Sequence, residues 1–260
     1  MIENVKKVLS VAGSDSCGGA GIQADIKTIS AFRQYAMTVV TAVTAQNSLG
    51  VRLVNAVCPE MVRTQLECIF EDMFPDAVKT GMLLNGSNVN ITADIIKEYK
   101  AQNVVCDTVI MSTSGKPLIE DDGLDIFVKM LMPLADVITP NIPEAQKLCG
   151  MKIDTVKDME NACTVLSGMV KGAVLIKGGH LDGEAVDILY TDGKFHYFSS
   201  KRIDNKNTHG TGCTLSAAIA CGLAEGLGAA DAVKKAKDYI TKAIGNKLEL
   251  GHGYGPLWHF

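Results

Sequence analysis

The chain has 260 residues, 47% of them hydrophobic, which is enough to bury one substantial core. Its 25 Lys and Arg residues against 29 Asp and Glu residues give a net charge of −4 and no basic block, which excludes nucleic acid as an expected partner. The apolar stretch near the N-terminus is too short for a signal peptide or a membrane span. We therefore expect a cytoplasmic protein with no membrane partner.

Short apolar runs alternate with longer segments of helical period, a pattern typical of an α/β protein with a mostly parallel sheet covered by helices. The expected strands, in chain order, are Val8–Gly13, Met37–Val43, Ala77–Gly81, Asn103–Asp107, Asp136–Pro140, Gly172–Gly178 and Val186–Tyr190. Residues 194–200 follow a Thr-Asp-Gly turn and are expected to pair antiparallel with the last of these strands.

Three expected helices have recognisable faces. One stripe is formed by Ile22, Ile26 and Ile29, and another by Val233, Ala236, Ile240, Ala243 and Ile244. The helix that begins at Thr211 is rich in Ala and Gly, so it is expected to lie close against the sheet. We find no repeat or linker, and predict one α/β domain over residues 1–260.

The eight cysteines form no Cys-x-x-Cys pair, and the five histidines form no His-x3-His pair, so neither a disulfide framework nor a Cys/His metal site is indicated. Six cysteines are interpreted as buried or half-buried apolar residues: Cys58, Cys68, Cys106, Cys149, Cys163 and Cys221. Cys17 and Cys213 differ, because both lie in glycine-rich surroundings.

Unusual residues follow the expected strands at their carboxyl ends. These are Gly13-Ser14-Asp15, Gly81-Met82, Asp107, Asn141 with Glu144, Lys177-Gly178-Gly179 and, after the hairpin, Thr208 to Cys213. Ligands of open parallel sheets bind where such loops converge. We therefore expect all of these residues to share one edge of the sheet.

Two of these loops are rich in glycine. The loop after Gly13 has neither Gly-x-Gly-x-x-Gly nor Gly-x4-Gly-Lys spacing, so it is either a close-approach loop for a small ligand or a tight turn. In Thr208–Gly212, Gly210 and Gly212 allow backbone N–H groups to converge at a helix N-terminus, which predicts an anion site. A glycine-rich helix cap is the alternative.

Charged residues at the same edge suit a metal and a phosphate. Asp107 and Glu144 together could hold hydrated Mg²⁺, although Glu144 also fits the first turn of a helix that starts at a proline. Lys177 ends an apolar run that does not tolerate an unpaired ammonium, so it requires either a phosphate or an internal salt bridge.

As a set, eight segments resemble the hydroxymethylpyrimidine/phosphomethylpyrimidine kinases of thiamine biosynthesis, members of the ribokinase-like superfamily. They are "AGSDSCGGAGIQADIKT", "VTAQNSLGV", "KTGML", "VVCDTVIMSTSG", "ITPNIPEA", "VLIKGGH", "NTHGTGCTLSAAIA" and "GHGYGP". The resemblance implies a three-layer α/β/α fold without a separate lid domain, and a homodimer. It also implies transfer of the γ-phosphoryl of Mg·ATP to 4-amino-5-hydroxymethyl-2-methylpyrimidine and then to its monophosphate, towards thiamine diphosphate.

The resemblance also implies residue roles. Gly13, Asp25, Gln46, Met82 and Val109 would line the pyrimidine pocket, and Asp107 and Glu144 would serve Mg²⁺. ATP phosphates would be held by Lys177, Thr208, His209, Gly210, Thr211 and Gly212. Cys213 would lie beside the substrate hydroxymethyl, and catalysis would fall to Cys213, Gly210, Gly212 and Lys177. The Gln46 amide has a donor and an acceptor, which match the edge of an aminopyrimidine.

Cys213 stands where many ribokinase-like enzymes have an aspartate. A thiol with a reference pKa of about 8.5 is expected to have a lowered pKa at a helix N-terminus, which would provide thiolate near neutral pH. Phosphoryl transfer needs little deprotonation of the attacking hydroxyl until late, so a weak base suffices.

Three other functions stay open at this point. A pyridoxal or pyridoxine kinase would place the same thiol beside a pyridine hydroxymethyl group. A thiol hydrolase would use Cys213 with His209, and a sensor would need the pocket but no base. The adenine pocket is expected around Val186 to Ile203 and the helix near Ala243.

Overall fold

The computed structural model describes residues 4–110, 121–179, 185–200, 203–246 and 248–260. They form a sheet with the strand order β3-β2-β1-β4-β5-β6-β7-β8-β9. Strands β2, β1, β4, β5, β6 and β7 are mutually parallel, whereas β3 and β8 pair antiparallel with their neighbours and β9 pairs antiparallel with β8.

The strands are β1 (Lys7–Asp15), β2 (Tyr35–Asn47), β3 (Gly50–Ala56), β4 (Ala77–Thr80), β5 (Val104–Cys106), β6 (Val137–Ile138), β7 (Ala173–Ile176), β8 (Ala185–Thr191) and β9 (Lys194–Ser200). The helices are α1 (Gly21–Ala31), α2 (Pro59–Asp72), α3 (Gly86–Glu98), α4 (Asp121–Ile126), α5 (Ile142–Cys149), α6 (Val156–Ser167), α7 (Thr211–Ala224) and α8 (Ala229–Gly245). A π-helical turn, η1 (Phe127–Leu131), and a 3₁₀ turn, η2 (Met132–Leu134), follow α4.

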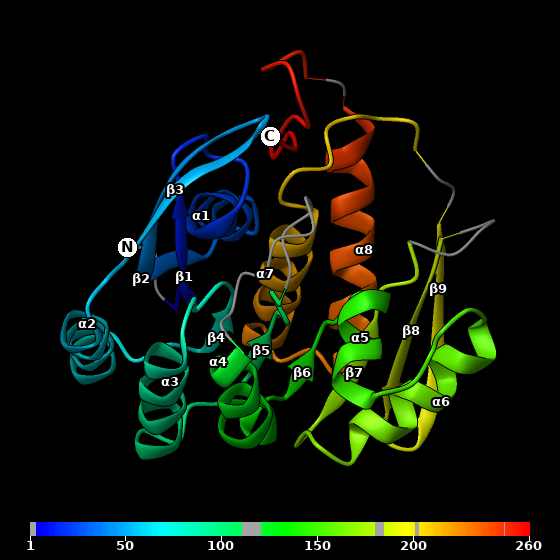
Figure 1. Cartoon of the computed structure of the whole chain (residues 1–260), viewed down its shortest axis with the longest axis horizontal. Helices are drawn as coiled ribbons and strands as arrows, with labels where there is room; N and C mark the ends of the chain where they lie inside the picture. The colour runs from blue at the N-terminus through cyan, green and yellow to red at the C-terminus, as the bar shows by residue number, and fades with distance from the viewer. Residues whose placement is uncertain (1–3, 111–120, 180–184, 201–202, 247) are drawn as a thin grey trace.

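The molecule has three layers (Figure 1). Helices α2 to α6 bury one set of apolar side chains against the sheet, and α1, α7 and α8 bury a second set against its other face. Helix α7 is buried along its length from Thr214 to Ala224, because its Ala and Gly residues allow close packing. The prediction of an α/β/α architecture is confirmed, and each expected strand is present.

One strand was not predicted. β3 pairs antiparallel with β2, which continues to Asn47 rather than ending at Val43. The hairpin extends beyond the body of the sheet, so the exposed side chains of Val43 and Leu53 give no clean alternation of buried and exposed positions. The strand was missed because periodicity reports burial, and this hairpin is little buried.

Two smaller expectations were wrong. Ile26 is exposed, whereas Ile22 and Ile29 are buried, because α1 presents only part of the isoleucine stripe to α7 and the sheet. Cys58 and Cys68 are exposed, since they lie at the start and on the outer face of α2. The stripe of α8 is buried as predicted at Val233, Ala236, Ile240 and Ala243.

The strand order creates a switch point between β1 and β4. Chain connections run from β1 to β2 on one side and from β4 to β7 on the other, so the loops diverge there. In open α/β sheets this is where a crevice at the carboxyl ends of the strands binds ligands. The loop after β9 reaches the same edge, because β9 is parallel to β7. In the described part of the chain, no helix is long and apolar enough to cross a membrane.

Candidate active site

The loop before α7 is built for close backbone approach. Gly210 is the N-cap of α7, with a φ of 86°, and a Cβ at this position would lie 1.8 Å from the carbonyl oxygen of Gly19. Only glycine combines that left-handed conformation with that contact. The two glycine-rich loops are therefore packed against each other at the positive end of α7.

A lysine and a carboxylate face this helix terminus. Lys177 Nζ donates to Asp107 Oδ1 at 3.3 Å, and a Cβ built on Gly212 would be 3.5 Å from Lys177 Nζ and 3.7 Å from Asp107 Oδ2. Three segments distant in sequence thus meet, as the strand-end pattern predicts. The salt bridge foreseen as an alternative partner for Lys177 is present, and its ammonium is also close enough to α7 to meet an anion there.

Asp107 is held as an ionised carboxylate. It is buried, and it accepts hydrogen bonds from Thr139 Oγ1 at 3.1 Å and Ser216 Oγ at 3.2 Å. Burial opposes ionisation, but Lys177, Lys79 and the Thr139 hydroxyl outweigh it and hold the pKa of Asp107 below its ordinary value. Sequence reasoning missed Thr139 and Ser216, because single hydroxyl residues in apolar segments give no local signal.

Glu144 has a structural role as well as a place at the site. It forms a capping box with Asn141 at the start of α5, and it also accepts from Thr108 Oγ1 at 3.1 Å. Burial raises the pKa of Glu144, with Lys177 opposing and Asp107 reinforcing the rise. The proline-started helix considered from the sequence is therefore confirmed.

The donor set around Lys177 fits a hydrated divalent cation. Two carboxylates and one ammonium leave one net negative charge, and both carboxylates are oriented by protein donors. Mg²⁺ usually keeps several waters and uses one or two carboxylates together with substrate phosphates. Asp107 and Glu144 could hold such an ion through its waters while keeping their protein hydrogen bonds.

The pKa of Cys213 differs in direction from the expectation. Burial raises it to about 11, Lys79 and the backbone N–H of Gly21 lower it, and Asp25 and Asp107 raise it. The helix terminus predicted from the sequence is present, but burial near two carboxylates dominates. The thiol is therefore protonated at neutral pH.

Beneath Cys213 lies an ion pair that the sequence did not reveal. Lys79 Nζ is 2.8 and 3.0 Å from the two carboxylate oxygens of Asp25, Ser10 Oγ donates to Asp25 at 2.5 Å, and both charged side chains are 0% exposed. Asp25 was expected to line the pyrimidine pocket. Its carboxylate is instead enclosed by protein donors, one layer below the surface. A charged residue within the apolar strand Ala77–Thr80 was the available signal.

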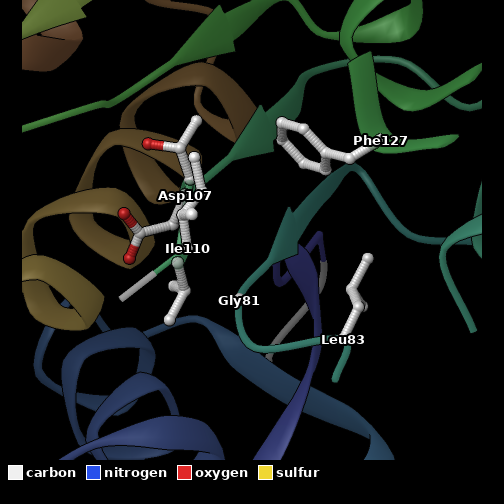
Figure 2. Close-up of a pocket in the computed structure, with 7 residues that line it drawn as sticks. Gly81, Leu83, Asp107, Ile110 and Phe127 are labelled. Atoms are coloured by element: carbon white, nitrogen blue, oxygen red, sulfur yellow. The ribbon is translucent and has the colours of Figure 1, made fainter. Parts of the chain in front are cut away.

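The other expected pocket residues lie along the crevice. A Cβ on Gly13 would be 2.4 Å from the terminal methyl of Met82, so these residues are in direct contact. Val109 contributes to a small pocket with Gly81, Leu83, Asp107, Thr108, Ile110 and Phe127. Figure 2 shows Leu83 and Phe127 on the side of this pocket opposite Asp107 and Ile110. Asn88, buried on α3, donates to the carbonyl oxygens of Thr41 and Leu83 and so fixes the Met82 loop.

His209 was expected among the ATP phosphates, and its ring contacts Asp15 and Gln46. Nε2 lies 2.8 Å from Asp15 Oδ2 and 3.0 Å from Gln46 Nε2. Asp15, Cys17 and His209 have ligand atoms within 4.8 Å of one another, as a metal site would. However, the Asp15 carboxylate already accepts from the backbone N–H groups of Cys17, Gly19 and Ala20. The cluster therefore stabilises the turn between β1 and α1.

In the part of the chain that the structure describes, His209 makes its side-chain hydrogen bonds with Asp15 and Gln46 and none with Cys213. A Cys213–His209 hydrolase pair is therefore not formed. The structure does not describe residues 111–115 of the "VVCDTVIMSTSG" segment, His180 of "VLIKGGH" or residues 201–202 of the expected adenine region.

Comparison with known proteins gives consistent results. The sequence profile of a family described as phosphomethylpyrimidine kinase matches residues 15–258. The thiamine biosynthesis bifunctional protein ThiED of Geobacter sulfurreducens is 46% identical over 97% of this chain, which spans 52% of that relative's length. The hydroxymethylpyrimidine/phosphomethylpyrimidine kinase of Streptomyces coelicolor is 44% identical, over 97% of this chain and 93% of its own.

A solved structure also shares the fold at high similarity. The pyridoxal kinase from Staphylococcus aureus in complex with AMP-PCP and pyridoxal has a TM-score of 0.91 and 32% identity. The alignment covers 98% of this chain and 94% of that one. A nucleotide and a vitamin aldehyde are thus both bound by a neighbour with this architecture.

Proposed function

Because this chain belongs to the phosphomethylpyrimidine kinase family, we propose that it transfers the γ-phosphoryl group of Mg·ATP to 4-amino-5-hydroxymethyl-2-methylpyrimidine and then to the monophosphate it has made. The observation that carries the proposal is the meeting of Asp107, Lys177 and Gly212 at the N-terminus of α7. The product would serve thiamine diphosphate biosynthesis, in agreement with the Geobacter relative, which is named for thiamine biosynthesis.

At the phosphate end, charge stabilisation is the main task. Lys177 and the backbone N–H groups of Gly210 to Gly212, with Thr208 in the same loop, would bind the transferring phosphoryl group. Phosphoryl transfer passes through a loose transition state, so oriented donors matter more than a strong base. Asp107 orients Lys177 by the 3.3 Å hydrogen bond.

Mg²⁺ is part of the proposal, and Asp107 and Glu144 would hold it through its waters. When bound, the ion neutralises charge that develops on the phosphate oxygens. The residues themselves contribute orientation: Thr139 and Ser216 fix Asp107, while Asn141 and Thr108 fix Glu144.

On the acceptor side, Cys213 would position the hydroxymethyl group. With a pKa of about 11 the thiol is an S–H donor at neutral pH. The hydroxyl proton leaves late in a loose transfer and can pass to an oxygen of the phosphoryl group, so the protonated thiol of Cys213 would hold the hydroxyl by a hydrogen bond and would not accept its proton. This role needs no thiolate in the resting enzyme.

Four further properties belong to the proposal. Residues 1–260 would act as one domain, in the cytoplasm, as a homodimer like the family that the sequence resembles. The exposed apolar side chains of Val43, Leu49 and Leu53 on the β2–β3 hairpin support an interface between protomers. Adenine would bind near β8, the loop after β9 and α8.

Pyridoxal is the second candidate acceptor, because the Staphylococcus aureus neighbour binds it with the same fold at a TM-score of 0.91. The polar pair Gln46 and His209 favours the aminopyrimidine, whose edge has both donors and acceptors.

A coupled ADP-release assay tests the proposal with three acceptors: hydroxymethylpyrimidine, its monophosphate and pyridoxal. We expect turnover with both pyrimidines, slower turnover with pyridoxal, and loss of all turnover when EDTA removes Mg²⁺. ADP release with pyridoxal alone would replace the pyrimidine by the second candidate. No ADP release with any acceptor would favour a sensor and contradict kinase activity.

A further inference from the structure

Three chain segments meet at one ring nitrogen. His209 Nε2 lies 2.8 Å from the carboxylate of Asp15, the last residue of β1, and 3.0 Å from the side-chain amide of Gln46, near the end of β2. Asp15 is 4% exposed and His209 16% exposed, so water competes little for these contacts. A residue expected at the phosphates therefore belongs to the substrate end of the crevice.

The position of the proton on His209 follows from its partners. Asp15 also accepts the backbone N–H groups of Cys17, Gly19 and Ala20 at 2.8 to 3.0 Å, as an ionised carboxylate does. Burial opposes ionisation of Asp15, but the His209 and backbone hydrogen bonds outweigh it and lower its pKa. An ionised carboxylate has no proton to give, so Nε2 of His209 carries the hydrogen and donates it.

That conclusion decides how the Gln46 amide is oriented. A ring nitrogen that carries a hydrogen has no lone pair for an N–H donor, so it requires the carbonyl oxygen of Gln46 beside it. The two ends of a side-chain amide have nearly the same shape, and hydrogen-bond partners alone decide which end faces which neighbour. Oε1 of Gln46 therefore belongs next to His209.

Thr44 requires the same orientation independently. Its hydroxyl donates to the carbonyl oxygen of Ser14 at 2.9 Å, and it lies 3.4 Å from the far end of the Gln46 amide. The single hydroxyl hydrogen is already used, so Thr44 can only accept from that amide. The N–H₂ end of Gln46 therefore belongs beside Thr44.

The chain around this group leaves little freedom. The backbone N–H of Gln46 donates to Ser16 Oγ, and Ser16 Oγ donates to the carbonyl oxygen of Gln46. The backbone N–H of His209 donates to the carbonyl oxygen of Gly255, and a Cβ on Gly19 would be 2.4 Å from the His209 ring. Both side chains are thus held by their own backbones and by packing.

We propose that Asp15 and His209 determine substrate specificity by fixing the direction of the Gln46 amide. The inference rests on the proposed function and adds a selection rule to it. The fixed amide offers one N–H and one carbonyl lone pair in a set order, which match a ring nitrogen beside an amino group. A ring with an oxo group in place of the amino group presents N–H and C=O in the reverse order, and binds only if the amide turns and loses both partners.

The test compares two acceptors: the aminopyrimidine and its analogue with oxo in place of the 4-amino group. We expect His209→Ala to reduce the ratio of their kcat/KM values roughly tenfold, since one hydrogen bond no longer fixes the amide. The KM for ATP should change less than about twofold, because His209 is then not a phosphate ligand. His209→Gln, whose Nε2 can still donate, should keep most of the wild-type ratio.

The control is Gln102→Ala, at an exposed position shortly before β5 and therefore at the amino ends of the parallel strands, which should leave both the ratio and the KM for ATP unchanged. An unchanged ratio in His209→Ala, in an enzyme that phosphorylates the pyrimidine, overturns the inference alone. If the KM for ATP in His209→Ala rises by the same factor as the ratio of kcat/KM values falls, His209 binds the ATP phosphates, and the inference is overturned as well. Wild type without ADP release on the pyrimidine overturns the proposed function and this inference together.

Discussion

The two ends of the crevice that we propose to bind phosphate and substrate are built differently. At the phosphate end, Asp107 and Lys177 come directly after the core strands β5 and β7, and their charges are oriented by buried hydroxyl groups. At the substrate end, Asp15 and Gln46 lie at the ends of β1 and β2 and His209 lies in the loop before α7, and these segments hold one another by hydrogen bonds. Charged side chains directly after core strands thus form the first end, and hydrogen bonds among the ends of β1 and β2 and the loop before α7 form the second.

The C-terminal segment contacts the substrate end. The backbone N–H groups of His252 and Gly253 donate to Ser48 Oγ, and Gly255 accepts from His209. A Cβ on Gly253 would be 2.1 Å from the carbonyl oxygen of Ser48, so the segment needs glycine to approach the β2–β3 turn. The "GHGYGP" resemblance therefore corresponds to a strap between the Gln46 hairpin and the His209 loop.

The largest expected effect concerns the ion pair that lies between the two ends. Lys79→Met leaves the Asp25 carboxylate buried without its partner, which should cost about 3–5 kcal/mol of the free energy of unfolding. For a chain of this length that lowers the Tm by roughly 10 °C. Thermal unfolding followed by circular dichroism measures it.

The double variant Lys79→Met/Asp25→Asn should recover most of that loss, because no uncompensated charge is then buried. A double variant as unstable as the single one would show that packing of the lysine chain, and not charge, accounts for the stability. Either result leaves the comparison of the two ends intact, and it shows whether the charge or the packing of Lys79 and Asp25 stabilises the region between them.

Lys177→Met should break the phosphate end alone. Losing an oriented donor to the transferring phosphoryl group typically lowers kcat by 10²–10³-fold, about 2.7–4 kcal/mol of barrier. Steady-state kinetics should show this loss with little change in the KM for the pyrimidine. Lys152→Met, whose side chain is 82% exposed, is the matched control and should behave as wild type. An equal rise in the KM values for ATP and for the pyrimidine would contradict the separation of the phosphate end from the substrate end.

Acid should lower the free energy of unfolding by protonating His259, which holds the C-terminal segment against α8. His259 is buried, its Nδ1 lies 3.0 Å from the Tyr239 hydroxyl, and burial lowers its pKa from 6.5 to about 4. Since the unfolded chain binds this proton first, stability should be complete above pH 6.5 and fall as the pH drops towards 4. At 1.36 kcal/mol per pKa unit, the fall is worth about 3 kcal/mol.

Urea titrations at several pH values measure that slope, and His259→Phe should remove the part of it that lies between pH 6.5 and 4. His252→Phe, at an exposed position, should retain the wild-type slope. If the free energy of unfolding changes with pH in the same way in the wild type and in both variants, protonation of a group other than His259 destabilises the protein in acid.

Cys213→Ala should have the smallest of these effects, roughly a 10- to 100-fold lower kcat with a KM for ATP within about twofold. A thiol with a pKa of about 11 gives no thiolate plateau near neutrality, so alkylation of Cys213 by iodoacetamide should accelerate about tenfold per pH unit between pH 7 and 10. Mass spectrometry resolves this site from exposed Cys68. An alkylation rate that levels off below pH 9 would show that the pKa of Cys213 is low, as the helix N-terminus alone predicts.

Much of the fold could be predicted, because apolar runs and glycine turns are local signals. The strand ends that bear Asp107 and Lys177 were foreseen for the same reason: a charged residue directly after a buried strand is visible in one dimension. The β3 strand was not foreseen, because an exposed hairpin has no burial pattern to detect.

The residues that were missed or misplaced depend on contacts between distant segments. Lys79 and Asp25 are 54 positions apart, and His209 and Asp15 are 194 apart. The raised pKa of Cys213 arises from burial, which a helix-terminus argument omits. Sequence reasoning therefore found the side chains but not always the partners that determine their chemistry.

The most direct test of the two-ended site is isothermal titration calorimetry of two variants with two ligands, the pyrimidine and Mg²⁺ with a non-hydrolysable ATP analogue. Lys177→Met should weaken the nucleotide at least about tenfold and leave the pyrimidine nearly unchanged, and Gln46→Ala should do the reverse. If each variant weakens both ligands to the same extent, charge and direction are not separated along the crevice.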